Sequence, residues 1–155
     1  MGERSPINDT SARGTFIGMT MDTSRADMLQ AVLEGVAFAI RDSFEVARSL
    51  GIAIPRSMIC GGGSKSSLWR QMIADILGIP LDIPVTEQGP GYGGAMLAMV
   101  ACGVFENVQQ AAEKLIRVKD TVQPDSERMA LYEKRYQQFR QIYPACRELF
   151  KVLER

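Results

Sequence analysis

Cys60-Gly61-Gly62-Gly63-Ser64-Lys65-Ser66 joins a short apolar stretch to an amphipathic one. Residues 55–60 predict a strand, and apolar residues at helical spacing after the glycines predict a helix that ends at Gly78. Three glycines at such a junction let a ligand approach the main chain closely, beside the unpaired N–H groups of the helix. Turns of this kind commonly bind nucleotides. A tight turn with positive φ explains one glycine easily and three less well, so nucleotide contact is the favoured interpretation.

The segments on either side predict alternating strands and helices. Ser24 and Asp27 form a capping-box pattern that opens a long helix, which Gly51 is placed to end. Residues 81–85 predict a second strand, and a glycine-rich turn at residues 89–94 leads into a helix over residues 95–102. This order predicts parallel strands joined by right-handed crossovers.

The remaining segments predict a further strand and two more helical regions. Residues 15–20 are compatible with a short strand, and Asn107 caps a short helix that extends to residue 116. After Pro124-Asp125 a long helical segment carries an aromatic stripe, and Pro144 is expected to break or kink it. The stripe allows a separate hypothesis, a non-enzymatic interaction domain built around the C-terminal helix.

The composition excludes several classes of protein. The chain has 155 residues, 46% of them hydrophobic, which suits one domain with a real core. It has 18 basic and 18 acidic residues and no basic block, which argues against a nucleic-acid partner. Its uncharged apolar run over residues 95–105 is too short to cross a membrane, and no signal peptide is visible. The chain is therefore expected in the cytoplasm.

Cysteine and histidine usage limits the chemistry of the chain. Three widely spaced cysteines without a CxxC pair indicate a reducing compartment, and Cys60, Cys102 and Cys146 are each expected to be small core residues. The chain has no histidine, so Ser-His-Asp catalysis and His-ligated metal sites are excluded.

Two general nucleotide motifs fit the glycine turn poorly. A P-loop requires GxxxxGK[ST], but Ser64 precedes Lys65-Ser66 where a glycine is needed. A dinucleotide fingerprint of the GxGxxG type lacks its last small residue, because Ser66 stands there. Asp82 does lie about twenty residues further on, where a ribose-binding acid belongs. A dinucleotide-binding module therefore stays open as an alternative.

Two longer patterns resemble the FGGY family of carbohydrate kinases. The stretch Gly14-Thr15-Phe16-Ile17-Gly18-Met19, followed after seven residues by Asp27-Met28-x-x-Ala31-Val32-Leu33-Glu34, matches the family's second signature. The three glycines with Ser64-x-Ser66-x-x-Trp69-x-Gln71-x-x-Ala74-Asp75 match its nucleotide turn and following helix. Gln88-Gly89-Pro90-Gly91 and the tail at residues 136–150 look closest to the family's xylulose kinases.

The resemblance implies an α/β fold and a position within the family's two-lobed architecture. The fold would be a helix-rich, partial RNase H-like domain of the actin, Hsp70 and sugar-kinase superfamily, with the first strands of the domain missing. Residues 1–155 would be the C-terminal portion of the C-terminal, nucleotide-binding domain, with residues 125–153 as a helical segment packed on it. An exposed sheet edge would then favour a homodimer.

The resemblance also implies the activity. In the intact enzyme, ATP with Mg²⁺ would phosphorylate a ketopentose, xylulose to xylulose 5-phosphate, with gluconate kinase or another FGGY sugar kinase as the alternative. The family's nucleotide contacts fall on Gly61, Gly62, Gly63 and Ser66, and Ser66 often corresponds to Asn in relatives. Sugar and catalytic aspartate belong to the N-terminal lobe, so this chain supplies no catalytic residue and no metal ligand. Alone it is expected to be inactive and to bind ATP weakly at best.

Three further polar residues have a structural interpretation. Gln71 and Asp75 lie four residues apart on the predicted helix and are expected to orient the glycine turn and the adjoining strand. Glu34 is expected to be a buried, paired carboxylate.

Overall fold

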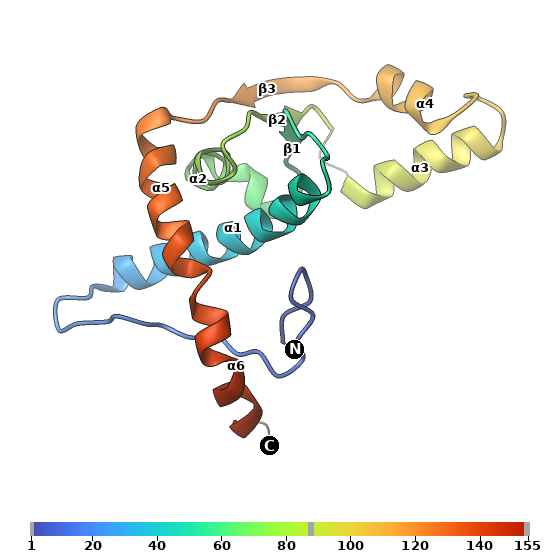
Figure 1. Cartoon of the computed structure of the whole chain (residues 1–155). Coiled ribbons are helices and arrows are strands. Elements are labelled where there is room, and N and C mark those ends of the chain that lie inside the picture. The colour runs from blue at the N-terminus through green and yellow to red at the C-terminus, as the bar shows by residue number, and fades with distance from the viewer. Residues whose placement is uncertain (1, 87–88, 154–155) are drawn as a thin grey trace. The chain divides into compact units, whose positions relative to one another are not determined.

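The computed structural model describes residues 2–86 and 89–153, so Gln88 lies outside the described residues. The helices are α1 (Arg25–Ser49), α2 (Ser67–Leu77), α3 (Gly89–Ala101), α4 (Val108–Leu115), α5 (Ser126–Phe139) and α6 (Ile142–Val152), with a 3-10 helix η1 (Gly62–Lys65) (Figure 1). The strands are β1 (Ser57–Met58), β2 (Leu81–Pro84) and β3 (Val118–Val122). The predicted helix-rich α/β fold is confirmed.

Two compact units make up the chain. The first contains the residues up to Ile54, the short piece Asp75–Leu77 and the residues from Asp125 onward. The second contains Pro55–Ala74 and Gly78–Pro124, and therefore holds the glycine turn and the sheet. None of the described helices is both long and apolar enough to cross a membrane.

Helix α1 begins as its sequence predicts. The Ser24 hydroxyl accepts a hydrogen bond from the Asp27 amide, and the Asp27 carboxylate accepts one from the Ser24 amide at 2.9 Å. Gly51, with φ +79°, follows the end of the helix. Residues 15–20 form no strand, and the side chains of Phe16, Ile17 and Met19 are exposed there.

The first unit is held together by aromatic contacts between α1 and α5, which cross in Figure 1. The buried Phe38 ring lies 6.2, 5.8 and 5.3 Å from the rings of Tyr132, Tyr136 and Phe139. Burial and a 2.6 Å hydrogen bond that the Tyr136 hydroxyl donates to Asp42 raise the pKa of Tyr136. Part of the predicted aromatic stripe is therefore covered within the unit.

The C-terminal helical segment is interrupted between α5 and α6. The break falls at Arg140 and Gln141, ahead of Pro144, which lies in the first turn of α6. A proline ring clashes with the carbonyl four residues earlier, so α5 cannot continue through Pro144, whereas a first turn tolerates proline. The predicted interruption is present but begins earlier than the proline itself.

The sheet of the second unit has the strand order β1-β2-β3. Strand β1 pairs with β2 in parallel, with Ser57 opposite Leu81, as predicted. Strand β3, which the sequence did not predict, pairs antiparallel to β2 with Val122 opposite Leu81. All four residues of β2 are buried, so this strand is the core of the unit.

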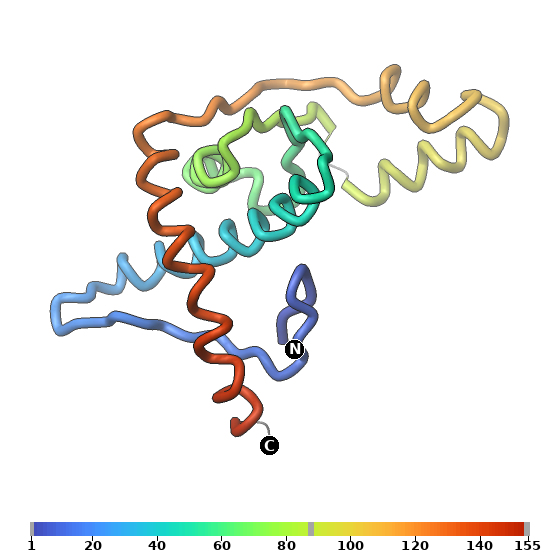
Figure 2. The backbone as a smooth tube through the Cα atoms, in the orientation of Figure 1, coloured from blue at the N-terminus to red at the C-terminus, as the bar shows by residue number. Residues whose placement is uncertain are grey.

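Helices α3 and α4 form a hairpin after β2; in Figure 2 the backbone turns back after α3 and returns through α4. The turn predicted at residues 89–94 is wrong, because α3 already begins at Gly89. The side chains of Met96 and Tyr92 pack inward there, and this packing overrides the poor helix propensity of the glycines.

The prediction that all three cysteines are core residues is wrong for two of them. Cys146 is buried, whereas Cys60 and Cys102 are exposed. Cys60 lies where the chain leaves the sheet for the glycine turn, and Cys102 follows the last turn of α3, so neither is covered by neighbouring elements.

Candidate functional site

The first glycine of the turn is required by the backbone. Gly61 has φ +90° and ψ 179° and caps η1. Residues with a Cβ atom rarely adopt this conformation, because it costs them about 1–3 kcal/mol. The backbone conformation therefore explains why position 61 is a glycine, without any ligand.

The third glycine is required by packing. A Cβ atom on Gly63 would lie 3.0 Å from Nε1 and 3.1 Å from Cδ1 of the Trp69 indole. Trp69 belongs to the first turn of α2 and packs back onto the glycine turn. Gly63 therefore allows the indole to rest directly against the main chain.

Neither the backbone conformation nor packing requires a glycine at the middle position of the turn. Gly62 lacks a positive φ, and a Cβ atom added to it would meet no atom within 4 Å. Gly62 is also exposed, so its main chain borders open space. A side chain there would occupy the space through which a ligand reaches the turn.

Ser66 ends the turn and begins α2. Its hydroxyl accepts a hydrogen bond from the Trp69 amide at 3.2 Å, which makes Ser66 the N-cap of the helix. The hydroxyl proton is not used by this cap. The four predicted contact residues, Gly61, Gly62, Gly63 and Ser66, are thus all exposed at one end of α2.

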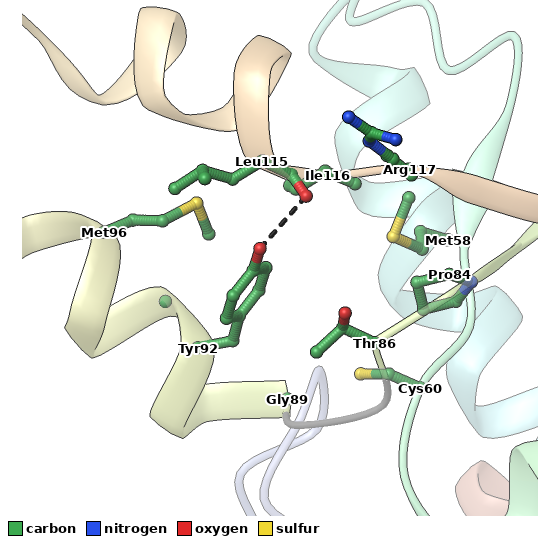
Figure 3. A pocket seen from close by; sticks show the side chains of 11 residues that line it. Met58, Cys60, Pro84, Thr86, Gly89, Tyr92, Met96, Leu115, Ile116 and Arg117 are labelled. Atoms are coloured by element: carbon green, nitrogen blue, oxygen red, sulfur yellow. Dashed lines mark hydrogen bonds between the residues drawn. The ribbon is translucent and has the colours of Figure 1, made fainter. Parts of the chain in front are cut away.

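A cavity of about 160 Å³ begins at Cys60, next to the glycine turn (Figure 3). Its wall is mostly apolar and comes from four segments of the second unit, namely Met58 and Cys60; Pro84 and Thr86; Gly89, Tyr92, Gly93 and Met96; and Leu115, Ile116 and Arg117. The Tyr92 hydroxyl donates a 3.0 Å hydrogen bond to the Leu115 carbonyl, which fixes α3 against the end of α4.

The residues of this cavity wall were not predictable from motifs in the sequence. Tyr92 belongs to the segment mistaken for a turn, Met96 lies in the helix predicted after it, and Leu115–Arg117 carry no motif. The spacing of Tyr92 and Met96, four residues apart, was the available sign of a helix, because it places both side chains on one helical face.

Asp82 occupies the central strand, and its carboxylate is hydrogen-bonded there. It is buried, and its Oδ1 accepts hydrogen bonds from Arg56 Nη2 at 2.6 Å and from Thr121 Oγ1 at 2.7 Å. The bond from Arg56, followed by that from Thr121, lowers the pKa of Asp82. A carboxylate that ties β2 to β3 is not free for a ribose, which argues against the dinucleotide-binding alternative.

The other polar candidates hold the fold together. Glu34 is buried and pairs with Arg135, as expected. Asp75 accepts a 2.8 Å hydrogen bond from the Asp125 amide, and Gln71 donates one of 2.9 Å to the Gln123 carbonyl. These bonds hold the segment before α5, whereas the expected targets were the glycine turn and its strand.

No group of three or more Cys, Asp or Glu side chains that could hold a metal ion occurs within residues 2–86 and 89–153. The geometry of the site therefore offers main chain, an apolar cavity and a helix N-terminus. These features suit a planar organic ligand better than a metal ion.

Comparison with known proteins adds a family and a set of relatives. A family model described as the FGGY family of carbohydrate kinases, C-terminal domain, matches residues 1–102. The chain is 34% identical over 148 residues to the xylulose kinase of Staphylococcus epidermidis, covering 96% of this chain and 30% of that protein. The chain thus spans about 30% of the length of the curated relatives that it matches first.

Two solved structures share the fold. The gluconate kinase of Lactobacillus acidophilus matches with a TM-score of 0.88 at 24% identity, over 97% of this chain and 30% of that one. The ligand-bound xylulose kinase of the same organism matches with a TM-score of 0.85 at 24% identity, over 97% and 31%. At this identity the likeness establishes the fold alone, which is that of sugar kinases.

Proposed function

Because the chain belongs to the FGGY family of carbohydrate kinases, as its motifs predicted, we propose that it is the nucleotide-binding C-terminal part of an ATP-dependent sugar kinase. Residues 1–155 would form the C-terminal portion of that domain, with residues 125–153 as the helical segment packed on it. The substrate would be a ketopentose, xylulose, converted to xylulose 5-phosphate. The 34% identity to a xylulose kinase supports this choice of sugar.

The observation that carries the nucleotide assignment is the open space at Gly62. Gly61 and Gly63 have reasons within the chain, so Gly62 is the glycine of this turn at which the missing side chain leaves room for a ligand. The adjoining cavity supports the same assignment, since its apolar wall suits the flat face of a purine. About 160 Å³ is less than the ~300–1,000 Å³ of a whole small-molecule site, so only part of a nucleotide would enter.

The role of this chain in the reaction is to hold the adenosine end of ATP. Phosphoryl transfer asks the protein mainly for positioning and charge neutralisation. Bound ATP would supply the phosphoryl group and Mg²⁺ would neutralise its charge. Gly62 would admit the nucleoside to the main chain, Gly61 and Gly63 would shape the turn, and the Ser66 hydroxyl would offer its free proton.

The sugar site and the aspartate that takes the hydroxyl proton would come from the rest of a longer kinase. The isolated chain would then be inactive. A gluconate kinase or another FGGY sugar kinase is the second candidate, because the family match over residues 1–102 is compatible with either sugar. Phosphorylation assays on the full-length kinase, with xylulose and gluconate in parallel, decide between the two sugars.

The proposal includes a cytoplasmic location, ATP and a sugar as ligands, and neither a membrane nor a nucleic acid as partner. A homodimer is also proposed, because β1 forms one edge of the sheet order and its outer side pairs with no described strand.

Titration of the chain with ATP, followed by amide NMR shifts, tests the nucleotide assignment. Gly62→Val should raise the Kd for ATP at least tenfold, because it fills the entrance, while the Tm stays within a few degrees. The matched control is Gly35→Val in α1, where an added Cβ also meets no atom within 4 Å. Equal ATP affinities for Gly62→Val and the unmodified chain would contradict the proposal.

A further inference from the structure

Arg70 of α2 contacts the glycine turn through Ser64. Its Nη1 donates a 2.8 Å hydrogen bond to the Ser64 carbonyl. Its Nε is buried and has no hydrogen-bond partner within the part of the chain that the structure describes. In the same part of the chain no carboxylate forms an ion pair with Arg70. The guanidinium is therefore held by one neutral acceptor.

This placement is unfavourable for Arg70 itself. A cation near the first turn of a helix opposes the helix dipole, and a buried N–H without a partner loses its hydration. One hydrogen bond to a neutral carbonyl offsets these two costs only in part. The bond to Ser64 therefore has a purpose other than the stabilisation of Arg70 itself.

Ser64 connects Arg70 to the conformation of the turn. Ser64 is buried, and both its hydroxyl and its amide donate to the Gly61 carbonyl, at 2.6 and 3.1 Å. The Arg70 bond thus fixes a residue whose hydroxyl and amide in turn hold the Gly61 carbonyl. Gly62 lies between Gly61 and Ser64, so its position follows from theirs.

We propose that Arg70 is a positioning residue for nucleotide binding, which acts through Ser64 to set the place of the Gly62 main chain. This inference rests on the proposed function, because it assumes that Gly62 borders the nucleotide. Arg70 itself touches no part of the nucleotide. Its loss would leave the binding surface present but displaced.

The test compares ATP affinities of three variants of the whole chain by NMR titration. Arg70→Met keeps the apolar stem and removes the donor, and it should raise the Kd for ATP about fivefold to tenfold. Arg70→Lys keeps a donor and the charge, and it should restore affinity to within about twofold of the unmodified chain. The matched control is Arg13→Met, because Arg13 also donates to main-chain carbonyls, those of Thr10, Ser11 and Ala12.

Hydrogen exchange separates positioning from general stability. In Arg70→Met the Ser64 and Ser66 amides, which bond the Gly61 and Gly63 carbonyls, should exchange faster while the amides of α1 stay unchanged. If Arg70→Met does not fold, Arg70→Gln replaces it, because glutamine is too short to reach the same carbonyl. Equal exchange and equal affinity in the variant and the unmodified chain would overturn the inference.

Failure of the two proposals gives different results. If Gly62→Val binds ATP as tightly as the unmodified chain does, the proposed function fails and the inference falls with it. If Gly62→Val weakens binding but Arg70→Met does not, the positioning inference alone fails. If Arg13→Met weakens binding as much as Arg70→Met, the effect is not specific to the turn, and the inference also fails.

Discussion

Replacing Asp82 by Asn should destabilise the second unit at neutral pH and leave it nearly unaffected in acid. Asp82 Oδ1 accepts hydrogen bonds from Arg56 and Thr121, both across neighbouring segments of the sheet. Hydrogen bonds to a charged group contribute about 1.5–3 kcal/mol each. Arg56 is 60% exposed, so its share is closer to the ~0–1 kcal/mol of a surface ion pair.

Asparagine retains one oxygen acceptor and recovers part of this energy. The expected loss in the free energy of unfolding is about 1–3 kcal/mol at pH 7. The sign of the pH dependence follows from the pKa of Asp82, which the native contacts lower below its ordinary 3.8. A lowered carboxyl pKa gives stability that is present above the unfolded pKa and is lost as the pH falls through the folded pKa.

Urea unfolding followed by the fluorescence of Trp69, the only tryptophan, measures this difference. The gap between the unmodified chain and Asp82→Asn should be constant from about pH 7 to 5 and should narrow as the pH falls below the unfolded pKa of about 3.9. It should close once Asp82 is protonated in the folded state, because a protonated Asp82 resembles asparagine. The exposed Asp22→Asn serves as a control that should show no gap. A gap that persists unchanged into acid, or none at pH 7, would refute this account of Asp82.

Four further results are expected. Phe38→Ala should lower the free energy of unfolding by about 3–5 kcal/mol, because it removes the buried ring between α1 and α5 and leaves a cavity. The half-exposed Phe16→Ala should change this free energy little, and urea unfolding measures both. Ser24→Ala removes the cap of α1 and should cost about 0.5–2 kcal/mol, seen in thermal unfolding by circular dichroism. The isolated chain should release no ADP from ATP and xylulose in a coupled assay, and turnover would contradict the proposed division of roles. Light scattering should detect dimers at high concentration, and a strict monomer would exclude the pairing proposed at β1.

Local signals in the sequence predicted the elements that local chemistry determines. The capping box at Ser24 placed the start of α1, and Gly78, with φ +66°, ends α2 where the pattern indicated. Strand β3 was not predictable in this way, because Lys119 and Asp120 interrupt its apolar residues. It forms by pairing with β2, and this pairing depends on a partner that lies far away in the sequence.

The candidate site also has one part that local sequence predicts and one part that depends on long-range contacts. The glycine turn is continuous in sequence and was found from it, whereas the cavity wall needs the register of the sheet to bring residues 115–117 beside α3. The error at residues 89–94 has the same origin. Glycines there suggested a turn, but packing of Tyr92 and Met96 favours a helix, and tertiary contacts outweigh propensity.

The three glycines of the turn are identical in the sequence and differ in the structure. One is explained by its backbone angles and one by the Trp69 indole, so the motif as a whole gives no measure of ligand binding. Only Gly62 lacks an internal explanation. A residue that is glycine for no internal reason is the one at which stability and binding should separate on substitution, and this separation distinguishes a nucleotide site from a merely tight turn.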